Sequence, residues 1–224
     1  DHRVLVTALF AFGTMVWSTA SQSLWGHAPG VFCVSLALFC LLALSARHTT
    51  RGFLAGFALG LGMLSRPTIG LFLFAIPAFL LVRRRWRPAV AVCVGALLPV
   101  AGLVAYNWHY THTVAAGGYG HIAGKWKTPL WLGFLGLTVA PSRGLLVYTP
   151  ATLIGVLGMW RLFFGASTDV ANESGSEAAK LVSPSIERTT LIGATVASVL
   201  TILLFSKWWA WHGGWSYGPR YLTE

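Results

Sequence analysis

Charged residues are scarce in this chain of 224 residues, and acidic ones are the scarcest. Lysine and arginine together number 16, whereas aspartate and glutamate together number only 6, so that 10% of the residues are charged. About a quarter of the residues of a typical soluble domain are charged. Here 55% are hydrophobic and the mean hydropathy is +0.66. The composition therefore excludes an ordinary soluble domain, and also a disordered or collagen-like chain.

Cysteine is nearly absent. Cys33, Cys40 and Cys93 lie inside apolar runs, with no CxxC spacing and no neighbouring histidine. Neither a disulfide framework nor a structural zinc site is expected, and we interpret these cysteines as small residues buried in a membrane. His109 and His112 have a spacing that could hold a metal on a helix, but no third ligand follows in register. A divalent metal is therefore unsupported, and no cofactor is predicted for this chain.

The basic residues interrupt apolar runs and do not form a basic stripe on a polar face. Nucleic-acid binding needs such a stripe, so we predict lipid and not nucleic acid as the partner of the basic residues. A signal-peptide pattern is missing. The chain opens at Asp1 without an initiator methionine and stops at Glu224, straight after a motif-rich stretch, which predicts a fragment of a longer protein.

Apolar segments of membrane-spanning length divide the chain. About 20 apolar residues in a helix cross a bilayer, with a range near 17–25. Five segments meet this length clearly: 4–20, 30–46, 88–106, 144–163 and 189–206. The run 130–140 is too short and is expected to be a re-entrant or interfacial helix.

A broken pair of helices is predicted between Arg51 and Arg83, where the apolar stretch is too long for one span and short for two. Pro67 lacks an amide hydrogen and restricts the residue before it, so a helix should end there. We expect two short helices, 52–64 and 68–82. The predicted fold is all-α: a polytopic transmembrane helical bundle of about seven spans, in which residues 1–224 form a single transmembrane domain.

The distribution of lysine and arginine orients these spans. The tight basic clusters, such as the one at 83–87, fall on the cytoplasmic side together with 165–188, which is expected to be a flexible loop. The polar and aromatic clusters all fall on the other side. They include an extracytoplasmic loop at 107–129 and an extracytoplasmic motif segment at 207–224. The working face is therefore predicted to be extracytoplasmic.

Three arginines on that face are candidate phosphate ligands: Arg66, Arg143 and Arg220. A charge between two apolar half-helices, as at Arg66, is costly and is usually functional or paired. An arginine fork suits a phosphate, and a lipid phosphate is the anion available at a membrane surface. The alternative is that these arginines only anchor helix ends at the headgroups.

Histidines and aromatic rings accompany the arginines. His27 is expected in the turn between the first two spans, beside Trp25, and His212 and Tyr217 lie in the motif segment. Aromatic rings stack on sugar rings, and an imidazole can act as a base or a ligand. The alternative is a belt of aromatic residues at the membrane interface. We predict Trp25, His27, His212 and Tyr217 to bind substrate.

Five motifs, in order along the chain, carry a resemblance to a known group. They are GTMVWS at 13–18, SLWGHAP at 23–29, LSRPT at 64–68, PSRGLLVYTP at 141–150 and GGWSYGPRYL at 213–222. The chain resembles prokaryotic polytopic membrane proteins of the GT-C superfamily, related to the family 39 glycosyltransferases (protein mannosyltransferase-like and aminoarabinose transferase-like). The resemblance implies an integral protein of the prokaryotic cytoplasmic membrane, working in cell-envelope assembly.

Such enzymes pass a sugar from a polyprenyl-phosphate carrier to an acceptor on the extracytoplasmic side. The resemblance implies an acidic base in the first outer loop and cationic groups on the leaving lipid phosphate. Glu224 is the only acidic residue predicted on the outer face, so the catalytic carboxylate is expected upstream of this fragment and no residue here is assigned as catalytic. The matching positions would be Arg66, Arg143 and Arg220 at the phosphate, with Trp25, His27, His212 and Tyr217 lining the cavity.

Two other functions fit parts of the sequence. A transporter or flippase for a lipid-linked or anionic solute would use broken helices such as 52–64 and 68–82, although no internal repeat is visible. A non-catalytic membrane subunit of an envelope-assembly complex would tolerate loss of Arg66 or Arg220.

Overall fold

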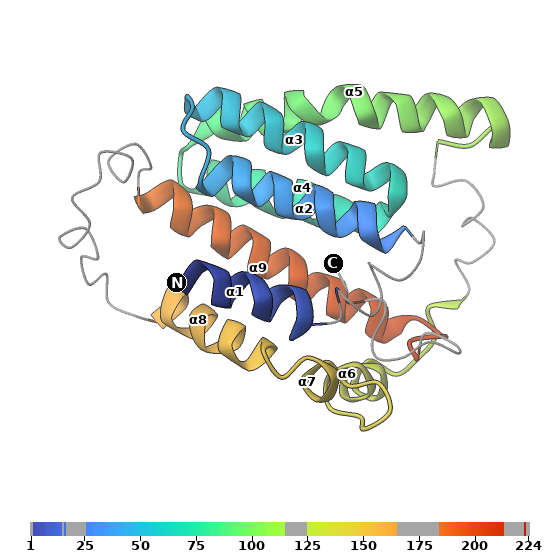
Figure 1. Ribbon diagram of the computed structural model, residues 1–224. Coiled ribbons are helices and arrows are strands. Elements are labelled where there is room, and N and C mark those ends of the chain that lie inside the picture. Colours follow the sequence, from blue (N-terminus) through green and yellow to red (C-terminus); the bar gives the residue numbers. More distant parts are fainter. Residues whose placement is uncertain are drawn as a thin grey trace.

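The computed structural model describes residues 2–14, 16, 26–114, 125–164, 184–212 and 222. Within these residues all regular elements are helical and no strand is present (Figure 1), so the predicted all-α class is confirmed. The α-helices are α1 (His2–Phe12), α2 (His27–Leu42), α3 (His48–Ser65), α4 (Gly70–Val82), α5 (Trp86–Thr111), α6 (Leu130–Thr138), α7 (Leu145–Tyr148), α8 (Thr152–Phe164) and α9 (Pro184–Lys207). A 3₁₀ turn, η2 (Pro67–Ile69), leads into α4.

Helix α3 packs against both α2 and α5, and α4 joins this group to α9. Figure 1 shows α1 and α8 on the other side of α9. The buried core lies between α2, α3, α4, α5 and α9 and consists mainly of small and aliphatic side chains, together with Phe72. Its most enclosed members include Ala37, Ala55, Leu59, Leu80 and Val92.

Glycines let α3 and α5 approach closely. A Cβ at Gly56 would lie 1.9 Å from the carbonyl oxygen of Val92, and one at Gly95 would lie 2.0 Å from that of Phe53. Gly52 and Gly60 are one turn away on either side of Gly56 and face the same partner helix. Small residues spaced by four are how membrane helices bring their backbones into contact.

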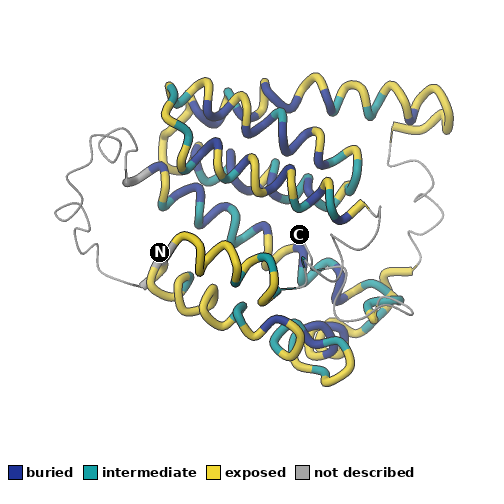
Figure 2. Tube along the Cα trace, in the orientation of Figure 1, coloured by how far each residue is buried: buried dark blue, intermediate teal, exposed yellow. Residues whose placement is uncertain are grey.

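Two helices are long and apolar enough to cross a membrane: α5, and α9 from Ile186 onward. Shorter apolar helices comprise Arg3–Phe12, His27–Leu42 and Pro67–Val82. Exposed positions recur along α5 (Figure 2), and they include large apolar residues such as Leu97, 63% exposed, and Leu98, 74% exposed. An apolar surface of this extent suits contact with lipid. The total of about seven spans stays a prediction.

Different helix ends and turns lie at the two ends of the helix bundle. One end, which we call the site end, holds the start of α2, the break after α3, the C-terminal ends of α5 and α9, and the short helices α6 and α7 (Figure 1). The other end, which we call the basic end, holds the first residues of α3, α5 and α9 and the last residues of α4 and α8. The alternation of predicted spans gives the same grouping. Which end faces the cytoplasm stays a prediction.

The predicted span 144–163 is wrong as a continuous helix. Helix α7 ends at Tyr148 and α8 begins at Thr152. Thr149 has φ −138° and ψ 67°, because Pro150 disfavours the helical conformation of the residue before it. The same chemistry ends α3 at Ser65, where a break was predicted and is confirmed. A short helix at 130–138 is also present, as expected.

Other boundaries differ from expectation at the helix ends. His27 is the first residue of α2 and does not lie in a turn. Helix α5 continues to Thr111, so the first residues of the predicted loop 107–129 are helical. Helix α9 begins at Pro184 and takes in the last residues of the predicted loop 165–188. Helix α1 ends at Phe12, well before the predicted residue 20.

The Gly56→Ala substitution should destabilise the protein, because its Cβ would meet a backbone oxygen that moves only if α3 and α5 separate. We expect a loss of about 2 kcal/mol in unfolding free energy, seen as a lower Tm in detergent. Gly102→Ala is the matched control. No atom of the described residues lies within 4 Å of a Cβ at Gly102, so alanine should leave the Tm unchanged or raise it. An equal Tm for Gly56→Ala and wild type would contradict the close packing.

Candidate functional site

The break between α3 and α4 fixes the position of Arg66. Pro67 is the first residue of η2, and Arg66 before it is extended, with φ −146° and ψ 112°. Its amide donates to the Gly62 carbonyl at 2.9 Å, and its carbonyl accepts from the amide of Ile69 at 3.1 Å. Both backbone groups are therefore satisfied although the helix has ended, and the turn is held from both sides.

The Arg66 side chain is bound to the first residue of α2. Its Nη1 donates to the His27 imidazole, with Nδ1 the nearer ring nitrogen and Nε2 at 3.2 Å. Arginine has only donors, so the histidine accepts. His27 is 6% exposed. Beside this contact Ser65 Oγ donates to the Gly26 carbonyl at 2.7 Å, so two adjacent residues of the break are bound to two adjacent residues at the start of α2.

The guanidinium of Arg66 also lies against α9. Its Cζ is 5.9 Å from the centroid of the buried Phe205 ring. A cation over an aromatic face is stabilised by the ring's quadrupole. Arg66 therefore stands where α2, the break and the last turns of α9 come together.

A second arginine of the predicted set lies in the turn after α6. Arg143 is half-buried, and its Nη1 donates to the backbone carbonyl of His212. The segment that ends at His212 is packed against α6, because a Cβ at Gly136 would lie 2.2 Å from the Trp211 ring. The His212 side chain is exposed, and its ring centroid is 5.9 Å from that of Trp211.

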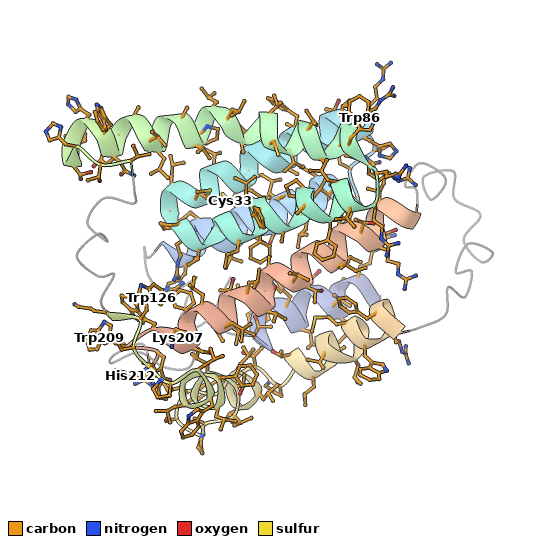
Figure 3. The ribbon with its side chains drawn as sticks, turned by 180° about the vertical axis from the view of Figure 1, so that it is seen from behind. Cys33, Trp86, Trp126, Lys207, Trp209 and His212 are labelled. Carbon is orange, nitrogen blue, oxygen red and sulfur yellow. The ribbon has the colours of Figure 1, made fainter. Side chains whose placement is uncertain are left out.

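Next to this contact lies a group that we call the aromatic shelf: Lys125, Trp126, Trp208 and Trp209. The Trp126 and Trp208 ring centroids are 4.7 Å apart, and Lys125 Nζ is 5.3 Å from the Trp209 ring. Backbone pairing holds the two segments together, since the Trp209 amide donates to the Lys125 carbonyl at 2.9 Å. Figure 3 shows Trp126, Lys207, Trp209 and His212 gathered at the same end of the bundle.

The sequence prediction missed Lys125 and Trp126 as members of a site. The tryptophan between Lys125 and Lys127 was the available signal, but its pairing with Trp208 comes from a backbone contact between distant segments. Of the predicted residues, the structure brings together Arg66 with His27 and Arg143 with His212. Trp25, Tyr217 and Arg220 lie outside the described residues.

The site end is cationic throughout the described part of the chain. Glu187, on the first turn of α9 at the basic end, is the only acidic residue that the structure describes. No group of three or more histidine, cysteine or acidic side chains is placed to hold a metal within the described ranges. His109 lies on α5, and His112 caps its C-terminus with φ 51°. The side chains at the site end are therefore suited to binding an anion beside aromatic rings.

Residues 1–108 match the family model of dolichyl-phosphate-mannose-protein mannosyltransferases. The match covers just under half of the chain, and over these residues the chain is similar to glycosyltransferases of the GT-C type. The matched segment covers α1 to α4 and most of α5, and so includes both His27 and Arg66. The match supports the resemblance seen in the motifs over residues 1–108. No curated protein and no solved structure matches the chain.

The packing of the aromatic shelf can be tested by a disulfide. The Thr128 amide donates to the Lys207 carbonyl at 3.2 Å, which brings the two residues within reach of an S–S bond. With Cys33, Cys40 and Cys93 replaced by alanine, the pair Thr128→Cys and Lys207→Cys should crosslink on mild oxidation, seen as a joined peptide by mass spectrometry. The control pair Thr128→Cys and Ser198→Cys should not, because Ser198 lies more than two helical turns away along α9. Equal crosslinking of both pairs would contradict the packing of the aromatic shelf described above.

Proposed function

We propose that the protein transfers a sugar from a polyprenyl-phosphate carrier to an acceptor on the extracytoplasmic side of a prokaryotic cytoplasmic membrane. The observation that carries the proposal is Arg66, which is bound to His27 at a break between two apolar helices. The family match supports it, since the matched family is described by a lipid-phosphate sugar donor. The acceptor that this description names is a protein, and a protein acceptor is part of the proposal.

The leaving group explains why arginine is needed. In the transfer, an acceptor hydroxyl oxygen bonds to the anomeric carbon of the sugar while the bond from that carbon to the phosphate oxygen breaks. The bonding electrons stay on the phosphate, whose negative charge grows. A guanidinium placed in advance beside that oxygen stabilises the charge where it develops. Arg66 takes this role, with Arg143 and Arg220 as further phosphate ligands.

The remaining residues position the reactants. His27 accepts from Arg66 and holds the guanidinium in place, which makes it a positioning residue. The aromatic shelf offers ring faces for a sugar or for the prenyl chain, and Trp25, His212 and Tyr217 complete the predicted lining. We assign no residue as the base that takes the acceptor proton, because Glu187, the one acidic residue among those described, lies at the basic end.

The alternative function, a transporter, is supported by the same break between α3 and α4, where a transported anion would bind beside Arg66. The other alternative, a non-catalytic membrane subunit, requires that the site residues only anchor helix ends at the lipid headgroups. The family match favours transfer over both. Each alternative gives a different result in the experiment that follows.

The test is sugar turnover by the full-length protein in membranes supplied with polyprenyl-phosphate sugars. Arg66→Ala should lower turnover at least 100-fold, as loss of one preorganised donor to a developing anion typically does. Arg66→Lys should keep part of the activity, because lysine retains the charge but not the fork. Arg220→Ala is expected to resemble Arg66→Ala. Arg161→Ala is the matched control: an exposed arginine on α8, near the basic end, whose loss should leave turnover at the wild-type rate.

Wild-type turnover by Arg66→Ala, at equal expression and Tm, would contradict the assignment of Arg66. A wild-type protein that binds the carrier but transfers nothing would overturn the proposal of catalysis and favour transport.

The role of His27 is separable from that of Arg66. His27→Ala removes the acceptor that orients the guanidinium and should lower kcat about tenfold. His27→Gln keeps an acceptor oxygen and should recover most of the loss. The measurement is kcat and KM for both variants. If glutamine were as damaging as alanine, a positioning role through a hydrogen bond would be wrong.

A further inference from the structure

The basic end of the bundle contains a cavity of about 460 Å³ that the proposed transfer does not use. This volume is in the range of small-molecule sites. Its walls are strongly cationic, and the residues that matter for its chemistry are Arg47, His48, Arg84, Arg85, Trp86 and Arg87.

Helix starts surround this cavity. His48 and Trp86 are the first residues of α3 and α5, and Ile186, which also lines the cavity, is the third residue of α9. The first turn of a helix carries amide groups without helical partners and a partial positive charge. These helix starts therefore add to the positive potential of the four arginines.

A buried arginine stands one turn behind the wall. Arg51 is 2% exposed, and its Nε and Nη1 atoms have no hydrogen-bond partner among the described residues. Its amide donates to the Arg47 carbonyl at 3.0 Å, which places it next to the cavity wall. Burying a cation is costly unless an anion compensates its charge, and an anion in the neighbouring cavity would do so.

Backbone strain is tolerated at another wall residue. Arg84 has φ 56° and occupies the left-handed position that follows α4. Its amide donates to Leu81 and the amide of Arg85 donates to Leu80, both at 2.8 Å. This is the helix ending in which glycine is the usual residue. An arginine here gives up stability and places a guanidinium at the cavity, as strained residues at binding sites do.

We propose that this cavity binds a phosphate group, and that an anionic phospholipid headgroup is its source. Arginine forks match phosphate oxygens. Trp86 is 60% exposed, and its ring lies 5.3 Å from the Arg87 Cζ. An exposed tryptophan beside arginines is typical of the headgroup level of a membrane, and basic pockets between membrane helices bind anionic headgroups. The site lies at the opposite end from the sugar-transfer residues and does not depend on them.

The experiment uses the full-length protein in phosphatidylcholine nanodiscs, with phosphatidylglycerol added in steps. We expect phosphatidylglycerol to raise the Tm and to stay bound in native mass spectrometry. Arg84→Gly should raise the Tm in pure phosphatidylcholine, because it relieves the left-handed strain, and yet lower the affinity for phosphatidylglycerol about fivefold. Arg87→Gln should lower that affinity by a similar factor.

Arg161→Gln is the matched control, because Arg161 is an exposed arginine near the same end but outside the cavity wall. It should leave the affinity unchanged. A second arm adds inorganic phosphate to the phosphatidylcholine nanodiscs. If phosphate gives a shift that Arg84→Gly weakens while phosphatidylglycerol gives none, the site is real but its source is free phosphate, which overturns the lipid assignment. No response to either, or an equal loss with Arg161→Gln, would overturn the site itself.

Discussion

Pro67 is the constraint on which the site end depends. It ends α3, holds Arg66 in an extended conformation and starts the 3₁₀ turn that leads into α4. Only with the helix ended there does Ser65 reach Gly26 while Arg66 reaches His27 and Phe205. One residue without an amide hydrogen thus positions a charge at the meeting point of three helices. The glycine contacts between α3 and α5 hold the other face of α3 in place.

The arginines at the two ends of the bundle differ in their contacts. At the site end Arg66 and Arg143 are each tied to a specific acceptor, the His27 ring and the His212 carbonyl. At the basic end, two side-chain nitrogens of Arg51 have no hydrogen-bond partner within the described residues, and they lie beside a cationic cavity. Glu187 is the only acidic residue among those described, so within these residues neither end contains a set of carboxylates. We propose that anionic ligands complement both ends, the phosphate of the sugar carrier at the site end and a phospholipid headgroup at the basic end.

The all-α class, the break at Pro67 and the short helix at 130–138 follow from the sequence, because apolar length and proline chemistry are local properties. The break before Pro150 was not predicted, because the apolar run 144–163 has the length of a membrane span. Pro150 nevertheless interrupts the helix there, as Pro67 does at the end of α3. The two contacts of the site, Arg66 with His27 and Arg143 with His212, could not be predicted from the sequence. Arg66 and His27 are 39 positions apart and Arg143 and His212 are 69 apart, and no local pattern encodes which distant residues meet. The pairing of Trp126 with Trp208 is hidden for the same reason.

The central claim is that Arg66 holds the phosphate of the sugar carrier. A structure of the full-length protein with bound polyprenyl phosphate tests it most directly. We expect a phosphate oxygen within hydrogen-bond distance of the Arg66 guanidinium, about 2.7–2.9 Å, with the His27 contact kept. A carrier phosphate bound away from Arg66, or at the basic end, would contradict it.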